Sequence, residues 1–65
     1  MKKAQFLLKL VQMAGEIIAK YGAKMFAKIV AAVKAHWKTI CKWVAEWAIW
    51  EVLAKIVEKI TSGEW

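Results

Sequence analysis

The sequence predicts an all-α fold, a compact four-helix bundle that holds together without disulfides. Every periodic segment repeats its apolar side chains at steps of three and four residues, which is the spacing of one helix face. The chain has no proline and one cysteine, and its apolar content of 62% exceeds the ~45–50% of ordinary globular chains. Because the core of a 65-residue chain supplies only a few kcal/mol of net stability, we expect dense apolar packing within a single domain.

That single helical domain is expected to cover residues 1–65. Its helices are expected at approximately 2–20, 23–34, 38–45 and 48–61. The apolar stripes of these four segments can share one core only if the chain reverses near Gly22, near His36 and near Glu46.

The segment 2–20 has the clearest helical pattern. Its apolar stripe consists of Leu7, Leu10, Val11, Ala14, Ile17, Ile18 and Tyr21, opposite a narrow polar face. Gly15 interrupts this stripe at a cost of ~1 kcal/mol relative to alanine, so it suggests either the close approach of another helix or a slight bend. Gly22 follows Lys20 and Tyr21 in the position that a helix C-cap prefers.

The two middle segments alternate between apolar and lysine-bearing faces. In 23–34 the inward set is Phe26, Ile29, Val30 and Val33, and the outward set is Lys24, Ala27, Lys28 and Ala31. No glycine or proline marks the boundary near residues 35–37. In 38–45 the inward set is Ile40, Cys41 and Val44, and the outward row is Lys38, Lys42 and Glu46.

The segment 48–61 is the last expected helix. Its inward set is Ile49, Val52, Leu53, Ile56 and Ile60, and its outward set is Glu51, Lys55, Glu58 and Lys59. Glu51 and Lys55 have the favoured order for an ion pair four residues apart. The run Thr61–Gly63 ends the helix and leaves Glu64 and Trp65 as a short tail.

Six lysines follow one another between residues 17 and 45 without a carboxylate among them. They are Lys20, Lys24, Lys28, Lys34, Lys38 and Lys42. Steps of about four residues place lysines on one helical stripe, whereas ordinary soluble faces interleave both signs. The net charge of +6 points to an anionic partner, either nucleic acid or lipid headgroups. Nucleic-acid binders use arginine for bidentate contacts and this chain has none, so we expect a lipid partner and no nucleic acid.

The five tryptophans belong to a residue type that favours the boundary between water and lipid. Trp37 and Trp47 continue inward stripes, and we expect them in the core. Trp43 and Trp50 lie toward the edges of their stripes, and Trp65 is in the tail, so these three are expected on the surface. The predicted membrane-binding set is therefore Lys20, Lys24, Lys28, Lys34, Lys38, Lys42, Trp43, Trp50 and Trp65.

The sequence offers little for catalysis or for cofactors. One histidine, His36, and one cysteine, Cys41, are too few for a zinc site. We find no acid–base pair, serine triad or phosphate loop, and we expect no enzyme activity, no cofactor and no metal. Lys9 interrupts the apolar stretch at 6–8, so we predict no signal peptide. Charges also interrupt every segment that could reach the ~20 apolar residues of a transmembrane helix.

Three short motifs carry a resemblance to a known family. Residues 18–24 read IAKYGAK, residues 37–43 read WKTICKW, and WAI and AKI follow at 47–49 and 54–56. In their order and spacing these motifs resemble those of the leaderless class II bacteriocins, the aureocin, lacticin Q, epidermicin and enterocin L types. The resemblance covers roughly residues 6–60.

This resemblance implies a saposin-like helical bundle that is made without a leader and disrupts Gram-positive cell membranes, in several members without a protein receptor. The chain departs from the family pattern in its greater length, its five acids and the missing glycine before the third helix. Circular bacteriocins, of similar length and equally helical, are near neighbours.

The expected function is that of a secreted antimicrobial peptide acting at the membrane of target bacteria. Lysines attract it to anionic lipid, tryptophans seat in the headgroup region, and the bound protein permeabilises the membrane. Oligomerisation in the membrane is left open. The alternative is a small basic helical interaction module that binds nucleic acid or an acidic protein, and a third reading is a bundle without a ligand.

Overall fold

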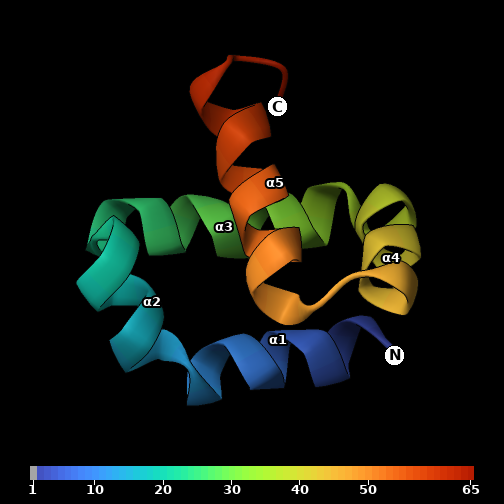
Figure 1. Cartoon of the computed structure of the whole chain (residues 1–65), viewed down its shortest axis with the longest axis horizontal. Helices are drawn as coiled ribbons and strands as arrows, with labels where there is room; N and C mark the ends of the chain where they lie inside the picture. Colours follow the sequence, from blue (N-terminus) through green and yellow to red (C-terminus); the bar gives the residue numbers. More distant parts are fainter. Residues whose placement is uncertain (1) are drawn as a thin grey trace.

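The computed structural model describes residues 2–65, which fold into five α-helices (Figure 1). The helices are α1 (Lys3–Gln12), α2 (Ala14–Tyr21), α3 (Ala23–Ala35), α4 (Trp37–Glu46) and α5 (Ile49–Thr61). No residue in this range lies in a strand, and Cys41 is a free thiol. The predicted all-α fold without disulfides is therefore confirmed. The single domain expected over 1–65 includes Met1, which lies outside the described residues.

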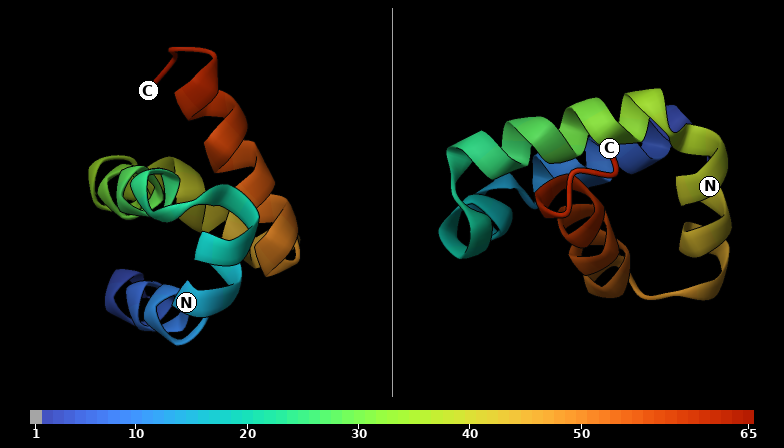
Figure 2. Two further views of the ribbon diagram at one scale, coloured as in Figure 1. Left: turned by 90° about the vertical axis from the view of Figure 1, so that its left-hand side faces the viewer. Right: turned by 90° about the horizontal axis from the view of Figure 1, so that it is seen from above.

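Helix α3 is the central element of the bundle. It contacts each of the other four helices: α5 crosses in front of it in Figure 1, α1 lies below it, and α2 and α4 adjoin its two ends. The two further views in Figure 2 show the same arrangement from the side and from above. The radius of gyration is 10.6 Å, close to the value of about 10.7 Å that compact chains of this length have.

The core consists of ten buried apolar side chains, and every helix contributes to it. They are Phe6, Leu10, Ile17, Ile29, Ala32, Val33, Ile40, Val52, Leu53 and Ile56. No polar or charged side chain among residues 2–65 is buried. All but two of the ten were predicted to face inward. Ala32 was assigned to neither face of its helix, and Phe6 was not recognised as part of the core, although its ring lies 5.7 Å from that of Trp37.

The expected helix over 2–20 is wrong in its continuity, because the chain bends at Met13. The Met13 N–H is shared between the carbonyls of Lys9 (3.0 Å) and Leu10 (3.2 Å), and a new helix starts at the next residue. A straight helix of this length would measure about 28 Å, as long as the whole molecule at 27 Å. The bend instead wraps α1 and α2 around α3, so that both contribute to the core.

Gly15 does not bring another helix close. It is exposed, and a Cβ at this position would meet nothing within 4 Å. The bend lies two residues before it, at Met13.

Part of the apolar stripe of the first segment faces solvent. Leu8 is 58% exposed, Val11 64% and Ile18 39%, so the inward positions predicted for Val11 and Ile18 are wrong. The reason is that α1 and α2 lie at the edge of the bundle and cover only one flank of α3. Their broad stripe is therefore buried along one half, and Val11 and Ile18 of the other half are exposed. Together with Leu8, which lies three residues before Val11, we call these residues the exposed apolar ridge.

Helix boundaries lie at or next to the three positions where chain reversals were expected. Gly22 separates α2 from α3, His36 separates α3 from α4, and Trp47 and Ala48 connect α4 to α5. Gly22 has φ +92° and donates its N–H to the Ile18 carbonyl at 2.8 Å. Because side chains rarely tolerate a positive φ, glycine is the natural residue at this turn.

We predict that Phe6→Ala lowers the free energy of unfolding by about 3–5 kcal/mol, since truncating a buried aromatic leaves a cavity. That loss rivals the whole stability of a domain this small, so urea titration followed by circular dichroism should show a largely unfolded chain. Leu8→Ala, two residues away and exposed, is the control and should stay within about 0.5 kcal/mol of the parent. Equal effects of the two substitutions would refute the assignment of Phe6 to the core.

Candidate membrane-binding surface

All six lysines of the predicted set are exposed. Lys20 lies on α2, and the other five lie on α3 and α4. The ion pairs recorded within residues 2–65 involve other lysines, with Lys55 bound to Glu58 at 3.7 Å and Lys59 bound to Glu64. The predicted lysines therefore present their charge to solvent without a carboxylate partner in that part of the chain.

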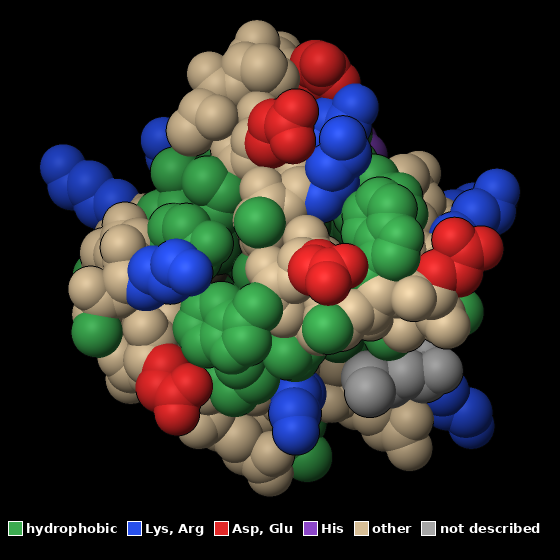
Figure 3. Space-filling view, viewed as in Figure 1, with side chains coloured by type: hydrophobic (Ala, Val, Ile, Leu, Met, Phe, Trp, Pro, Cys, Tyr) green, Lys and Arg blue, Asp and Glu red, His purple; other side chains and the backbone are tan. Residues whose placement is uncertain are grey.

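The outer face of α3 is the most uniform cationic surface. Its exposed residues are Ala23, Lys24, Ala27, Lys28, Ala31, Lys34 and Ala35. Alanine side chains are short, so the lysine side chains stand above their surroundings. The acids lie on other elements: Glu16 on α2, Glu46 on α4, Glu51 and Glu58 on α5, and Glu64 in the tail. Figure 3 looks onto the side where α5 lies in front, and acidic side chains are visible there among lysines and apolar patches.

The structure brings together Lys20 and Trp50 of the predicted set. The Lys20 ammonium lies 5.2 Å from the centre of the Trp50 ring and 5.7 Å from that of Tyr21. A cation over an aromatic face is stabilised by the ring quadrupole, so this contact links α2 to the start of α5. Trp50 itself is half-buried against the core, which is deeper than the surface position expected for it.

The core position predicted for Trp47 is wrong. It is the most exposed of the five tryptophans, at 37%, whereas Trp37 is half-buried against the core. Helix α4 ends at Glu46, and the Trp47 backbone is extended, with φ −117° and ψ 156°. The indole therefore leaves the helical stripe that its sequence spacing suggested.

Trp65 and Trp43 meet in a stack of four rings, which we call the aromatic column. Its centroid separations are 4.3 Å for His36–Trp65, 5.5 Å for Trp65–Trp43 and 5.7 Å for Trp43–Trp47, with interplanar angles of 16° or less. Trp43 and Trp65 are half-buried, which is deeper than the surface positions expected for them. The sequence did contain a signal for this stack. His36 and Trp43 are seven residues apart, which places their rings about 10 Å apart along a helix, and one further ring fits between them.

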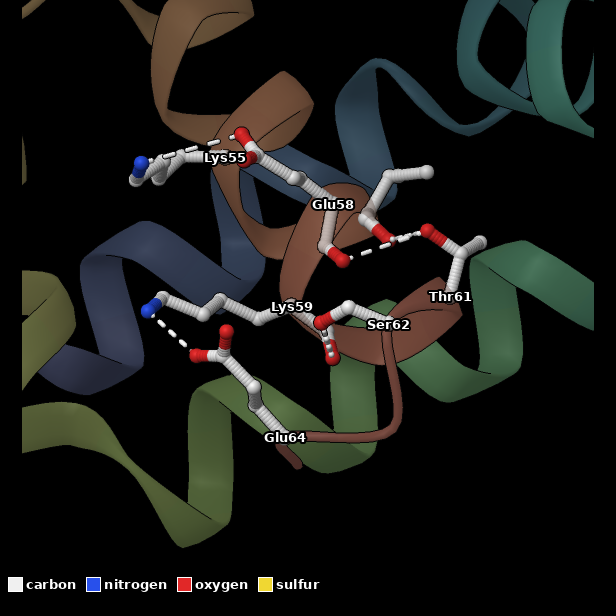
Figure 4. Close-up of polar contacts among 7 residues, drawn as sticks. Lys55, Glu58, Lys59, Thr61, Ser62 and Glu64 are labelled. Atoms are coloured by element: carbon white, nitrogen blue, oxygen red, sulfur yellow. Dashed lines mark hydrogen bonds and ion pairs between the residues drawn. The ribbon is translucent and has the colours of Figure 1, made fainter.

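The turn after α5 directs Trp65 into this gap. Gly63 has φ +79°, its N–H donates to the Ile60 carbonyl (3.2 Å), and the Glu64 N–H donates to the Lys59 carbonyl (3.0 Å). This pair of bonds is the Schellman ending of a helix. The Lys59–Glu64 ion pair joins the two side chains that the motif places together (Figure 4).

Among residues 2–65 the cation–π contacts are those of Lys20, so Lys24, Lys34, Lys38 and Lys42 contribute to the surface through their exposed charge. Residues 2–65 contain no group of three or more His, Cys, Asp or Glu side chains arranged to hold a metal ion. None of the helices described is both long enough and apolar enough to cross a bilayer.

Comparison with known proteins gives no match to a family model, to a curated protein or to a solved structure. The resemblance to leaderless bacteriocins therefore stays a prediction from the sequence motifs.

The Lys59–Glu64 pair makes the tail sensitive to acid. The hydrogen bond from the Lys59 ammonium, and then its charge, lower the pKa of Glu64 below its ordinary value of 4.5. Because the folded-state pKa is the lower one, the contribution of this pair is present above pH 4.5 and is lost as the pH falls through the folded-state value.

We therefore predict that the near-ultraviolet circular dichroism of the stacked indoles weakens on acidification below pH 4.5, as the tail detaches. Glu64→Gln should remove this titration and leave the signal flat over the same range. An unchanged acid transition in the Glu64→Gln variant would assign it to another carboxylate.

Proposed function

We propose that this protein is a secreted antimicrobial peptide of the bacteriocin type, which binds the anionic membrane of target bacteria and permeabilises it. One observation supports this proposal above all others. Six exposed lysines have no carboxylate partner in residues 2–65, and the outer face of the central helix carries only lysine and alanine. Such a surface suits a diffuse layer of anionic headgroups better than a single ligand.

The first step is electrostatic attraction. A lysine near an anionic surface contributes about 1 kcal/mol, so six of them supply up to about 6 kcal/mol at low salt. The second step is the insertion of exposed apolar side chains into the headgroup region. These side chains are the exposed apolar ridge of α1 and α2 and the indole of Trp47, and tryptophan is favoured in that region.

Permeabilisation follows from the small stability of the bundle. The core of a 65-residue chain supplies only a few kcal/mol of net stability. This is comparable to the free energy of the lysine attraction to the membrane. Lipid that binds the separated or tilted helices better than the closed bundle therefore shifts the population toward them. Their apolar stripes then lie among the acyl chains, as interfacial amphipathic helices do.

The aromatic column favours lipid over nucleic acid as the partner. Proteins that bind single strands stack bases on free aromatic faces. In the column Trp43 and Trp65 each stack against two other rings of the protein, so these indoles are already engaged in intramolecular stacking. Dye release from vesicles distinguishes a lipid partner from an acidic protein partner.

Dye release from vesicles tests the proposal. Phosphatidylglycerol vesicles should leak and phosphatidylcholine vesicles should not, and leakage should fall as salt rises. Replacing Lys24, Lys34 and Lys38 with glutamine should weaken binding to the anionic vesicles by about 3 kcal/mol at most.

The matched control is glutamine at Lys2, Lys3 and Lys9, which removes the same charge from exposed positions outside the set. We expect this control to lose less affinity than the first triple variant. Equal losses would mean that net charge alone acts, and absence of leakage from anionic vesicles would exclude membrane permeabilisation.

A further inference from the structure

A groove lies in the angle between α3 and the C-terminal end of α5. Its volume is about 400 Å³, within the range of ~300–1,000 Å³ that small-molecule sites occupy. Ala31, Ala32 and Ala35 of α3 line one side of it, and Ile60 and Trp65 line the other. Most of its lining is therefore apolar, and the short alanine side chains leave the space open.

The polar side chains of the groove are one lysine and one histidine. Lys28 and His36 are its titratable lining residues, and no carboxylate lines it. Lys28 has no recorded ion-pair partner within residues 2–65. The acid next to Trp65 in the chain, Glu64, is bound to Lys59. The charge of the groove is therefore complementary to an anion.

Two further contacts hold the wall of the groove in place. Trp65 stacks against both His36 and Trp43, with centroid separations of 4.3 and 5.5 Å, and the Lys59–Glu64 pair secures the chain that precedes it. Stacking covers a face of the imidazole, but its ring nitrogens lie in the ring plane, so an N–H at the edge stays able to donate. An immobilised aromatic wall beside the Lys28 ammonium and the edge of the His36 imidazole is pre-organised for a ligand with both an anionic and an apolar part.

We propose that this groove binds the phosphate headgroup of one anionic lipid, with the phosphate at Lys28 and His36 and the glycerol and first methylenes against the alanines, Ile60 and Trp65. The inference rests on the proposed function and adds a defined headgroup site to the diffuse attraction of the other lysines. Its occupant is a lipid because an inorganic anion would leave the apolar lining unused.

The test uses dihexanoyl-phosphatidylglycerol below its micelle concentration, so that no membrane surface is present. Titration followed by two-dimensional NMR should shift the Trp65 indole N–H and the Ala31 and Ala35 methyl signals. Inorganic phosphate and dihexanoyl-phosphatidylcholine should bind more weakly. Tighter or equal binding of either would overturn the assignment to an anionic lipid.

Lys28→Gln and Lys24→Gln form a matched pair of variants. Both residues are exposed on α3 and both changes remove one charge, but only Lys28 lines the groove. Lys28→Gln should weaken binding about fivefold, the equivalent of one lysine–phosphate contact. Lys24→Gln should change it by about twofold or less, because salt screens an exposed charge at a distance. Lys28→Arg should retain binding, since it keeps the charge.

Equal effects of the two glutamine variants would overturn the site. So would absence of any binding to the monomeric lipid. If anionic vesicles still leak in that case, the proposed function stands without the groove, and if they do not leak, the proposed function fails as well.

Discussion

The packing of one face of α3 against all four other helices is the constraint on which the rest of the structure depends. Ile29 and Val33 on that face are fully buried, and no buried polar group helps to hold the described residues together. Burying such side chains contributes about 1.5–3 kcal/mol each relative to exposure, and most of that gain is offset by chain entropy. Once this face is turned inward, the opposite face of α3 must carry its lysines in solvent.

The same constraint explains where the apolar surplus goes. Each neighbouring helix contacts the 13-residue helix α3 along one narrow strip of its surface. Helices α1 and α2 therefore bury only about half of their broad apolar stripe. The remaining apolar surface is divided between the exposed ridge and the aromatic side chains of α4, α5 and the tail. Trp65 shows how the chain limits this exposure, because it covers Trp43 and the imidazole of His36.

The helices and the exposure of the lysines could be predicted from the sequence because both depend on local periodicity. Gly22 could be predicted as a turn for the same reason, since a positive φ favours glycine. The break at Met13 could not, because residues 2–20 keep a single apolar stripe and only the size of the bundle requires a bend. The exposure of Trp47 could not be predicted, because it follows the last residue of α4 and its extended backbone takes the indole off the helical stripe. Phe6 could have been predicted, because it lies four residues before the buried Leu10 on the same face of α1. The aromatic column joins His36 to Trp65, 29 positions along the chain. The spacing of His36 and Trp43 leaves room for a further ring, but it does not identify Trp65 as the ring that fills it.

The central claim is that the bundle is closed in water and presents its lysines before it meets lipid. Native-state hydrogen exchange of the Ile29 and Val33 amides in lipid-free buffer tests this claim most directly. A closed bundle predicts that both amides exchange only through global unfolding, with a free energy equal to that from urea titration. Isolated helices of ~12–15 residues are marginal in water. Exchange of these two amides as fast as in such a helix, with protection gained only on anionic vesicles, would contradict the account.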